Sequence, residues 1–132
     1  MMNSISLIIP SKGDSKQVHK LLSTISLQKL LPNEIILINT NISKFKYEDV
    51  YLKFFKSKKI YFRCYNHKNL NPGEARNVGV NYSKYDLIAF LDVNTKPNND
   101  WLKNANNLIN KKKTDIVLGT TKYLANTQRK NY

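Results

Sequence analysis

Asp92 and Asn94 are the side chains of this sequence whose types and spacing best suit a chemical role. They directly follow an unbroken apolar run, Leu87–Leu91. Because side chains at i and i+2 of an extended segment point the same way, both could offer an oxygen atom to one hard cation, Mn²⁺ or Mg²⁺. Such a cation could bridge a diphosphate. The alternative is that the two residues only stabilise a turn before Pro97.

A second group of residues suits an anion. Asn71-Pro72-Gly73-Glu74 has the form of a helix start, with a capping Asn, a Pro in the first turn and a Glu three residues after the cap. The free amides of such a helix start near Gly73, together with Arg76, would suit a phosphate group.

The elements that must position these residues alternate between strands and helices. Short apolar runs predict strands at 5–9, 34–39, 60–65, 87–91 and 115–118. Between them, apolar residues recur at helical spacing, as in Tyr47, Val50, Tyr51 and Phe54. Alternating strands and helices predict an α/β domain with three layers, a mostly parallel sheet and helices on both faces.

Polar residues follow the strands at the edge where such sheets place their ligands. Pro10, Ser11 and Lys12 end the first strand, and Asn39 ends the second. Because the carboxyl ends of parallel strands meet at one edge, we expect these residues to lie near Asp92.

Length and charge narrow the class of protein. A chain of 132 residues predicts a single domain over 1–132, with a frayed tail at about 124–132. The net charge of +13 favours anionic partners. The alternative is that the many Lys side chains only keep the surface of a small domain solvated. Lys residues are scattered and Arg residues number three, so a nucleic-acid partner is not expected.

Three further expectations concern single residues and location. Cys64 is predicted to be a half-buried, non-catalytic thiol, and His19 a surface histidine. No apolar segment approaches the ~20 residues that span a bilayer. A cytoplasmic location is therefore expected. Peripheral contact with the anionic inner face of the membrane is compatible with that location.

Five motifs in order carry a resemblance to a known family. They are ISLIIPSKGD, EIILINTN, NPGEARNVGV, YDLIAFLDVNTKPNNDWL and DIVLGTTKY. The chain resembles the N-terminal, nucleotide-sugar-binding part of glycosyltransferase family 2 enzymes, whose GT-A fold is Rossmann-like. The likeness runs from Ile5 to about Tyr123.

The resemblance implies a role for each candidate residue. Pro10, Ser11 and Lys12 match the loop that holds the base and ribose. Arg76 and Asn77 match the family's Ala-Arg-Asn segment, which lines the nucleotide pocket. Asp92 and Asn94 match the DxD motif, which binds ribose, diphosphate and a divalent cation, Mn²⁺ or Mg²⁺.

Two residues depart from the family pattern. Asn39 stands where the family usually has an Asp that contacts the base, and Asn94 replaces the second Asp of DxD. Each change removes a negative charge, which weakens the expected metal binding and leaves the preferred base open.

The resemblance further implies inverting transfer of a sugar from a nucleotide-diphosphate donor to a glycan or lipid-linked acceptor, as in polysaccharide biosynthesis. That reaction needs a carboxylate as general base, and no acidic residue follows Asp115. We therefore expect a truncated or short form with weak nucleotide binding and little activity. The alternative is a non-enzymatic basic module that docks on a partner protein, an anionic membrane or nucleic acid.

Overall fold

The chain folds into a parallel sheet with helices on both faces. The structure, a computed structural model, describes residues 2–122. Its elements are β1 (Ile5–Ser11), α1 (Ser15–Ser26), β2 (Glu34–Asn39), α2 (Asp49–Ser57), β3 (Tyr61–Asn66), α3 (Pro72–Tyr82), β4 (Leu87–Phe90) and α4 (Trp101–Lys112). The strands lie in the order β3-β2-β1-β4, and all neighbouring pairs are parallel. The predicted fold class is confirmed. The tail predicted at 124–132 lies outside the described residues.

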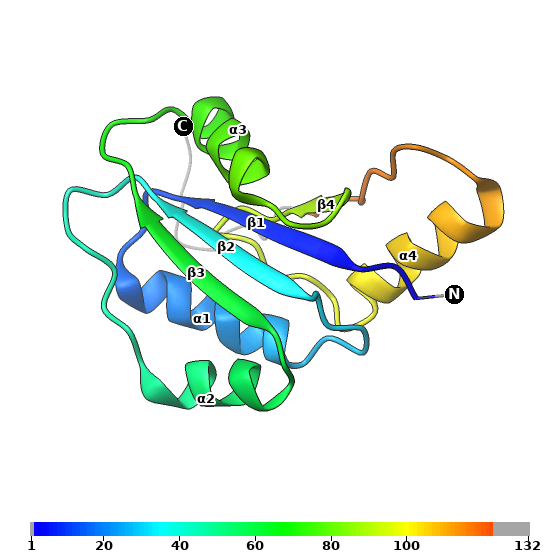
Figure 1. The fold of residues 1–132 in the computed structure, drawn as a ribbon, viewed down its shortest axis with the longest axis horizontal. Helices are drawn as coiled ribbons and strands as arrows, with labels where there is room; N and C mark the ends of the chain where they lie inside the picture. The colour runs from blue at the N-terminus through cyan, green and yellow to red at the C-terminus, as the bar shows by residue number, and fades with distance from the viewer. Residues whose placement is uncertain (1, 123–132) are drawn as a thin grey trace, which may run out of the picture.

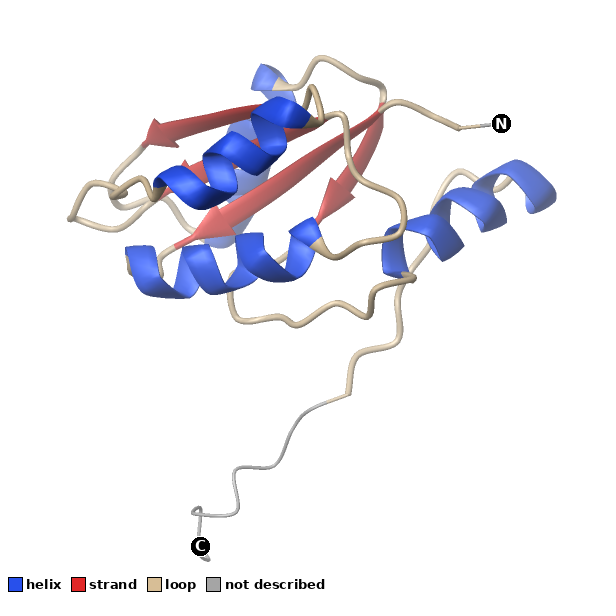
Figure 2. Ribbon diagram, turned by 90° about the horizontal axis from the view of Figure 1, so that it is seen from below, coloured by secondary structure: helices blue, strands red, loops and turns tan. Residues whose placement is uncertain are grey.

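The helices divide between the two faces of the sheet. Figure 1 shows α1 and α2 below the sheet and α3 above it, and Figure 2 shows α1 and α2 side by side in front of the strands. Leu7, Ile9 and their neighbours pack against α1 and α2, whereas Ile8, Ile36 and Ile38 pack against Ala75 of α3. This alternation along each strand is the reason that β1 and β2 are buried throughout.

Pro10 lies inside β1, although a proline was expected to end the strand. Its register partner is Ile38 of β2. The carbonyl oxygen of Ile8 accepts a hydrogen bond from Leu91 N, so the backbone N–H and C=O groups of the even-numbered residues of β1 point toward β4. The N–H that Pro10 lacks would point to that side, where β4 has ended at Phe90.

His19 is buried, and the predicted surface position is wrong. Its side chain is on the inner side of α1, and the residue is 4% exposed. The imidazole stacks on Phe45 and Tyr51, with ring centroids 4.9 Å and 5.7 Å apart. The loop that follows β2 covers this part of α1, a long-range contact that the periodicity of α1 alone does not reveal.

The apolar stripe predicted for the second helix is half right, because Tyr51 and Phe54 pack against the core whereas the other two residues are mostly exposed. Phe55 is the buried residue of α2, whereas Val50 is 73% exposed. Tyr47 precedes the helix and is 55% exposed. Phe55 faces inward because its ring stacks on Phe62 of β3, with planes 7° apart.

The fifth strand predicted at 115–118 is not formed. Ile116 and Leu118 are 74% and 88% exposed, and the segment belongs to no sheet. β4 is an edge strand of the described sheet, and residues 115–118 do not pair with its free side. β4 itself is half-buried rather than covered on both faces, and Phe90 is 42% exposed.

A buried carboxylate ties the start of the strands together. Glu34 is fully buried and accepts hydrogen bonds from Ser6 Oγ (2.5 Å), Lys84 N (2.5 Å) and Arg63 Nη2 (2.6 Å). It thereby joins β1, β2, β3 and the segment that enters β4. Among the described helices, none is long and apolar enough to span a bilayer.

Candidate nucleotide site at the carboxyl ends of β1 and β4

The loops after β1 and β4 lie side by side at the carboxyl edge of the sheet, a place that we call the crevice. The two strands are neighbours, but the chain goes from β1 through α1 to β2, which lies on the other side of β1 from β4. Ligands of open α/β sheets bind at such a point. The two loops touch, since a Cβ atom at Gly13 would lie 3.2 Å from Val93 Cγ1.

Arg76 and Asp92 form an ion pair at this crevice. Arg76 lies in the first turns of α3, and its Nη2 donates to Asp92 Oδ1 at 2.7 Å. The two side chains remain 35% and 59% exposed. The pair places a cation and a carboxylate where a ligand can reach both.

Asp92 and Asn94 do not point the same way, in contrast to the expectation for an extended segment. The chain turns at Val93 and Asn94, and the carbonyl oxygen of Asp92 accepts from Thr95 N (3.1 Å) and Thr95 Oγ1 (2.6 Å). The carboxylate faces Arg76, whereas Asn94 Oδ1 accepts from Gln17 Nε2 of α1 at 3.3 Å. The turn therefore separates the two side chains that were expected to act together.

This arrangement does not fit a cation chelated by Asp92 and Asn94 together. No group of three His, Cys, Asp or Glu side chains gathers anywhere in residues 2–122. Asp92 is the one acidic ligand that the turn offers, and Arg76 already neutralises it. Mg²⁺ often takes only one or two carboxylates together with substrate phosphates, so Asp92 is the residue that would hold it.

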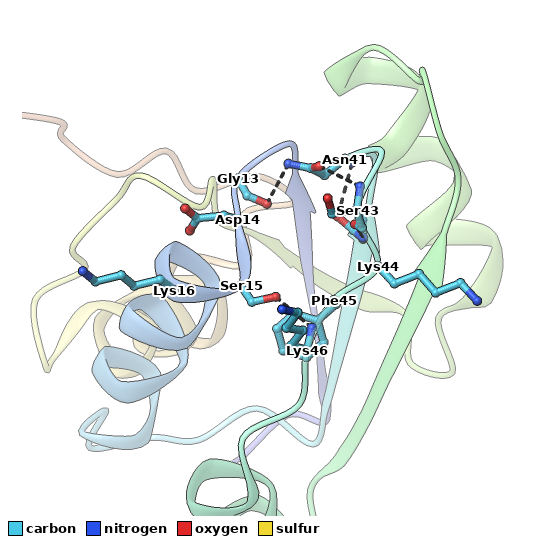
Figure 3. Close-up of a pocket in the computed structure, with 10 residues that line it drawn as sticks. Gly13, Asp14, Ser15, Lys16, Asn41, Ser43, Lys44, Phe45 and Lys46 are labelled. Atoms are coloured by element: carbon cyan, nitrogen blue, oxygen red, sulfur yellow. Dashed lines mark hydrogen bonds between the residues drawn. The ribbon is translucent and has the colours of Figure 1, made fainter.

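A pocket of about 340 Å³ lies beside the crevice. Its walls are residues 13–16 after β1, together with Asn39, Asn41 and residues 43–46 after β2. Figure 3 shows these loops facing each other, with Lys16 and Lys44 pointing outward on opposite sides. Because Gly13 belongs to the pocket wall and also touches Val93, the pocket and the Asp92 turn are neighbours.

Asn39 is a buried part of that wall, only 3% exposed. Its amide nitrogen donates to Ser43 O (2.9 Å) and to Asn66 Oδ1 (2.8 Å), and its Oδ1 accepts from Asn41 N (3.2 Å). A carboxylate could accept from Asn41 but could donate to neither of the other partners. The amide at this position therefore holds the loop after β2 in place.

The other predicted residues lie along the same edge. Ser11 is buried and its Oγ accepts from Gly13 N at 3.1 Å, whereas Lys12 is exposed and its carbonyl accepts from Asn41 Nδ2 at 2.9 Å. Pro10 is buried in the strand. Gly73 and Asn77 are exposed on α3, on either side of Arg76 in the sequence.

The structure adds residues that the sequence interpretation left out. Asn66 ends β3 in register with Asn39, and Asn41 joins the loops after β1 and β2. Asn66 could have been found by the rule that selected Asn39, since it is a polar residue at the carboxyl end of a strand. Asn41 and Gln17 act through contacts that bring distant segments together, and no local pattern marks them.

The thiol of Cys64 is half-buried, as predicted. Burial raises the pKa of this thiol to about 11, although a hydrogen bond to Tyr47 opposes the rise. A thiol with so high a pKa is almost fully protonated at neutral pH and is a poor nucleophile.

A comparison with protein families decides the relationship. The sequence model described as "Glycosyl transferase family 2" matches residues 6–130. This chain belongs to glycosyltransferase family 2. A search among curated proteins found no match.

Solved structures show the same fold. S. aureus TarS 1–349 is 20% identical, with a TM-score of 0.62 over 82% of this chain and 32% of that chain. The same protein in complex with UDP-GlcNAc is 19% identical, with a TM-score of 0.62 over 82% of this chain and 31% of that one.

A third similar structure comes from another organism. The mannosyltransferase PcManGT from Pyrobaculum calidifontis, in complex with GDP-Man and Mn²⁺, is 14% identical, with a TM-score of 0.63 over 80% of this chain and 32% of that one. The fold is therefore of the GT-A type, and this chain spans about a third of the length of each of these three solved chains.

Proposed function

We propose that this chain binds a nucleotide-diphosphate sugar across the crevice between the loops after β1 and β4. The observation that carries the proposal is the exposed Arg76–Asp92 pair at 2.7 Å, which lies at the carboxyl end of β4, beside β1. Membership of glycosyltransferase family 2 supports it. So do the UDP-GlcNAc and GDP-Man present in two similar structures.

The nucleoside would enter the pocket of about 340 Å³ between the loops after β1 and β2. Ser11 and Asn39 would fix the shape of that pocket, since both are buried and hydrogen-bonded within its loops. The diphosphate would pass over the Lys12–Gly13 side of the β1 loop toward the crevice, because Gly13 separates the pocket from Val93.

At the crevice, Arg76 and the backbone N–H of Gly73 would bind phosphate oxygens, because cations and helix-start N–H groups are suited to them. The neighbouring N–H groups of Asn71 and Glu74 are already used by the capping box. Asp92 would accept hydrogen bonds from ribose or sugar hydroxyls, and Asn77 would line the same side. A divalent cation, when bound, would neutralise the diphosphate, with Asp92 as its protein ligand.

The proposed reaction is limited to the donor side. Inverting transfer needs a general base beside the acceptor hydroxyl. We propose that the chain holds the donor for transfer to a glycan or lipid-linked acceptor and catalyses little transfer alone, since it spans about a third of the solved transferase chains that it resembles.

Titration calorimetry with UDP and with GDP, each with and without Mn²⁺, tests donor binding. We expect binding by the wild type and a loss of about tenfold or more in Asp92→Ala, because the ribose hydroxyls lose their carboxylate acceptor and a bound divalent cation loses its protein ligand. Asp100→Ala is the matched control, since Asp100 forms an ion pair of 2.9 Å with Lys29 outside the crevice. Absence of binding to either nucleotide, or equal binding by Asp92→Ala, would contradict the proposal.

The net charge of +13 favours a second function, a basic module that docks on an anionic surface. Its binding to RNA or to anionic vesicles would fall steeply with salt and would not change in Asp92→Ala. The same variant thus separates the two functions.

A further inference from the structure

His19 is a buried titratable side chain that donor binding, as set out above, leaves without a role. It lies on α1, one turn after Ser15, and is 4% exposed. Its Nε2 lies 2.7 Å from the carbonyl oxygen of Lys46. Because a carbonyl can only accept, the imidazole must donate through Nε2.

Lys46 is held by α1 at both of its backbone groups. While its carbonyl accepts from His19, its N–H donates to Ser15 Oγ at 2.8 Å. Lys46 is the last residue of the pocket wall that follows β2. Figure 3 shows Ser15 reaching this segment from the start of α1.

His19 also supports the pocket wall through its ring. Phe45 lines the pocket and stacks on the imidazole, with centroids 4.9 Å apart and planes 28° apart. The other end of the wall is fixed separately, because Asn39 donates to Ser43 O. Residues 43–46 are therefore clamped by Asn39 at one end and by Ser15 and His19 at the other.

We propose that His19 is a positioning residue for the nucleotide pocket, holding the wall at 43–46 in its binding conformation. The inference rests on the proposed function. It adds His19, which does not line the pocket but lies behind Phe45 and Lys46 of its wall. Without the hydrogen bond to Lys46 the wall would have more freedom, and a ligand would have to order it on binding.

The substitution His19→Phe isolates this role. A phenyl ring keeps an aromatic partner for Phe45 and Tyr51 but cannot donate to Lys46 O. His19 Nδ1 is buried without a hydrogen-bond partner, 3.9 Å from Glu48 Oε2, so removing it relieves a buried polar atom. The variant should therefore fold, and His19→Gln should restore part of the function because its amide donates again.

Two measurements test the inference. The first is amide hydrogen exchange of residues 43–46 in the nucleotide-free protein. We expect exchange about three- to tenfold faster in His19→Phe, as loss of one hydrogen bond implies. Ser26→Ala is the matched control, since it removes a side-chain bond to Ser23 O on the same helix without touching the wall; its exchange at 43–46 should equal that of the wild type.

The second measurement is UDP affinity. We expect His19→Phe to bind UDP about three- to tenfold more weakly than the wild type, and His19→Gln and Ser26→Ala to bind within about twofold of it. Unchanged exchange at 43–46 or unchanged affinity in His19→Phe would overturn the inference. If the wild type itself binds no nucleotide, the proposed function fails, and the exchange measurement still decides whether His19 holds the wall.

Discussion

Arg76 Nη2 and Asp92 Oδ1 lie 2.7 Å apart and join the start of α3 to the turn after β4. Arg76 lies near the start of α3 and Asp92 lies just after the end of β4, and the fold brings both to the carboxyl edge of the sheet. Exposed ion pairs contribute about 0–1 kcal/mol to stability, so this pair has little structural value. Its position at the crevice makes it more useful as a ligand contact than as a stabilising bond.

Arg76→Ala should therefore separate stability from binding. We expect the free energy of unfolding to fall by less than about 1 kcal/mol, while affinity for UDP falls about tenfold or more. Urea unfolding and calorimetry measure the two quantities. Lys29→Ala, which breaks an exposed pair of similar length outside the crevice, should lower stability by a similarly small amount and leave the affinity for UDP unchanged. Equal losses of affinity in both variants would show that general charge, not this site, binds the nucleotide.

Asn39→Asp should destabilise the protein even though it restores the acid that the family usually has. A carboxylate cannot donate to Ser43 O or Asn66 Oδ1, and each buried acceptor left unpaired costs about 1–3 kcal/mol. Urea unfolding at neutral pH measures the loss. Asn94→Asp is the control, since that amide oxygen accepts from Gln17 and an Asp can do the same. A fully stable Asn39→Asp would contradict the structural role given to the amide.

Glu34 should make stability depend on pH. Burial by itself raises the pKa of this carboxyl, but hydrogen bonds from Ser6, Lys84 and Arg63 outweigh burial and lower the pKa below the ordinary 4.5. A group with a lowered pKa contributes stability above its unfolded pKa and loses it as the pH falls through the folded value.

The expected result is a wild-type unfolding free energy that declines as the pH falls below about 4.5, and declines less in Glu34→Gln. Urea unfolding between about pH 7 and about pH 3 checks this. At neutral pH the Gln variant should itself be less stable by about 1–3 kcal/mol, because Arg63 loses its charged partner. Parallel pH profiles for the two proteins would show that another group controls acid unfolding.

Gly79→Ala should disturb the contact between α3 and β1. A Cβ atom at this position would lie 2.4 Å from Ile8 Cγ2 in the buried core. Overpacking of this kind costs about 1–3 kcal/mol. Gly73→Ala, whose Cβ would meet Asn71 Oδ1 at 3.4 Å, is the control for thermal unfolding and should not lower the melting temperature. Equal melting temperatures for the wild type and Gly79→Ala would mean that α3 does not pack as described.

The sequence was informative where local patterns and tertiary packing agree. The apolar runs of β1 and β2 are continuous because helices cover both faces. The start of α3 carries its own signal, since Asn71 and Glu74 form the predicted capping box. These features place Ser11, Asn39 and Arg76 at the correct edge of the sheet.

Failures arose where a distant segment decides the outcome. His19 is buried because the loop after β2 covers it, and residues 115–118 do not join the free side of β4, although their apolar run resembles that of a strand. The different directions of Asp92 and Asn94 depend on a turn and on the contacts of each with a different helix. None of these contacts can be predicted from the local periodicity of the sequence.

The most direct test of the donor site is a titration of UDP followed by the backbone amide resonances of the whole chain. We predict that the largest shifts fall on residues 12–16, 39–46, 73–77 and 92–95. In Arg76→Ala, the affinity for UDP that the titration gives should be about tenfold lower. The donor-site proposal would be contradicted if the shifts spread over lysines far from the crevice, such as Lys111 and Lys112 of α4, and disappeared at high salt.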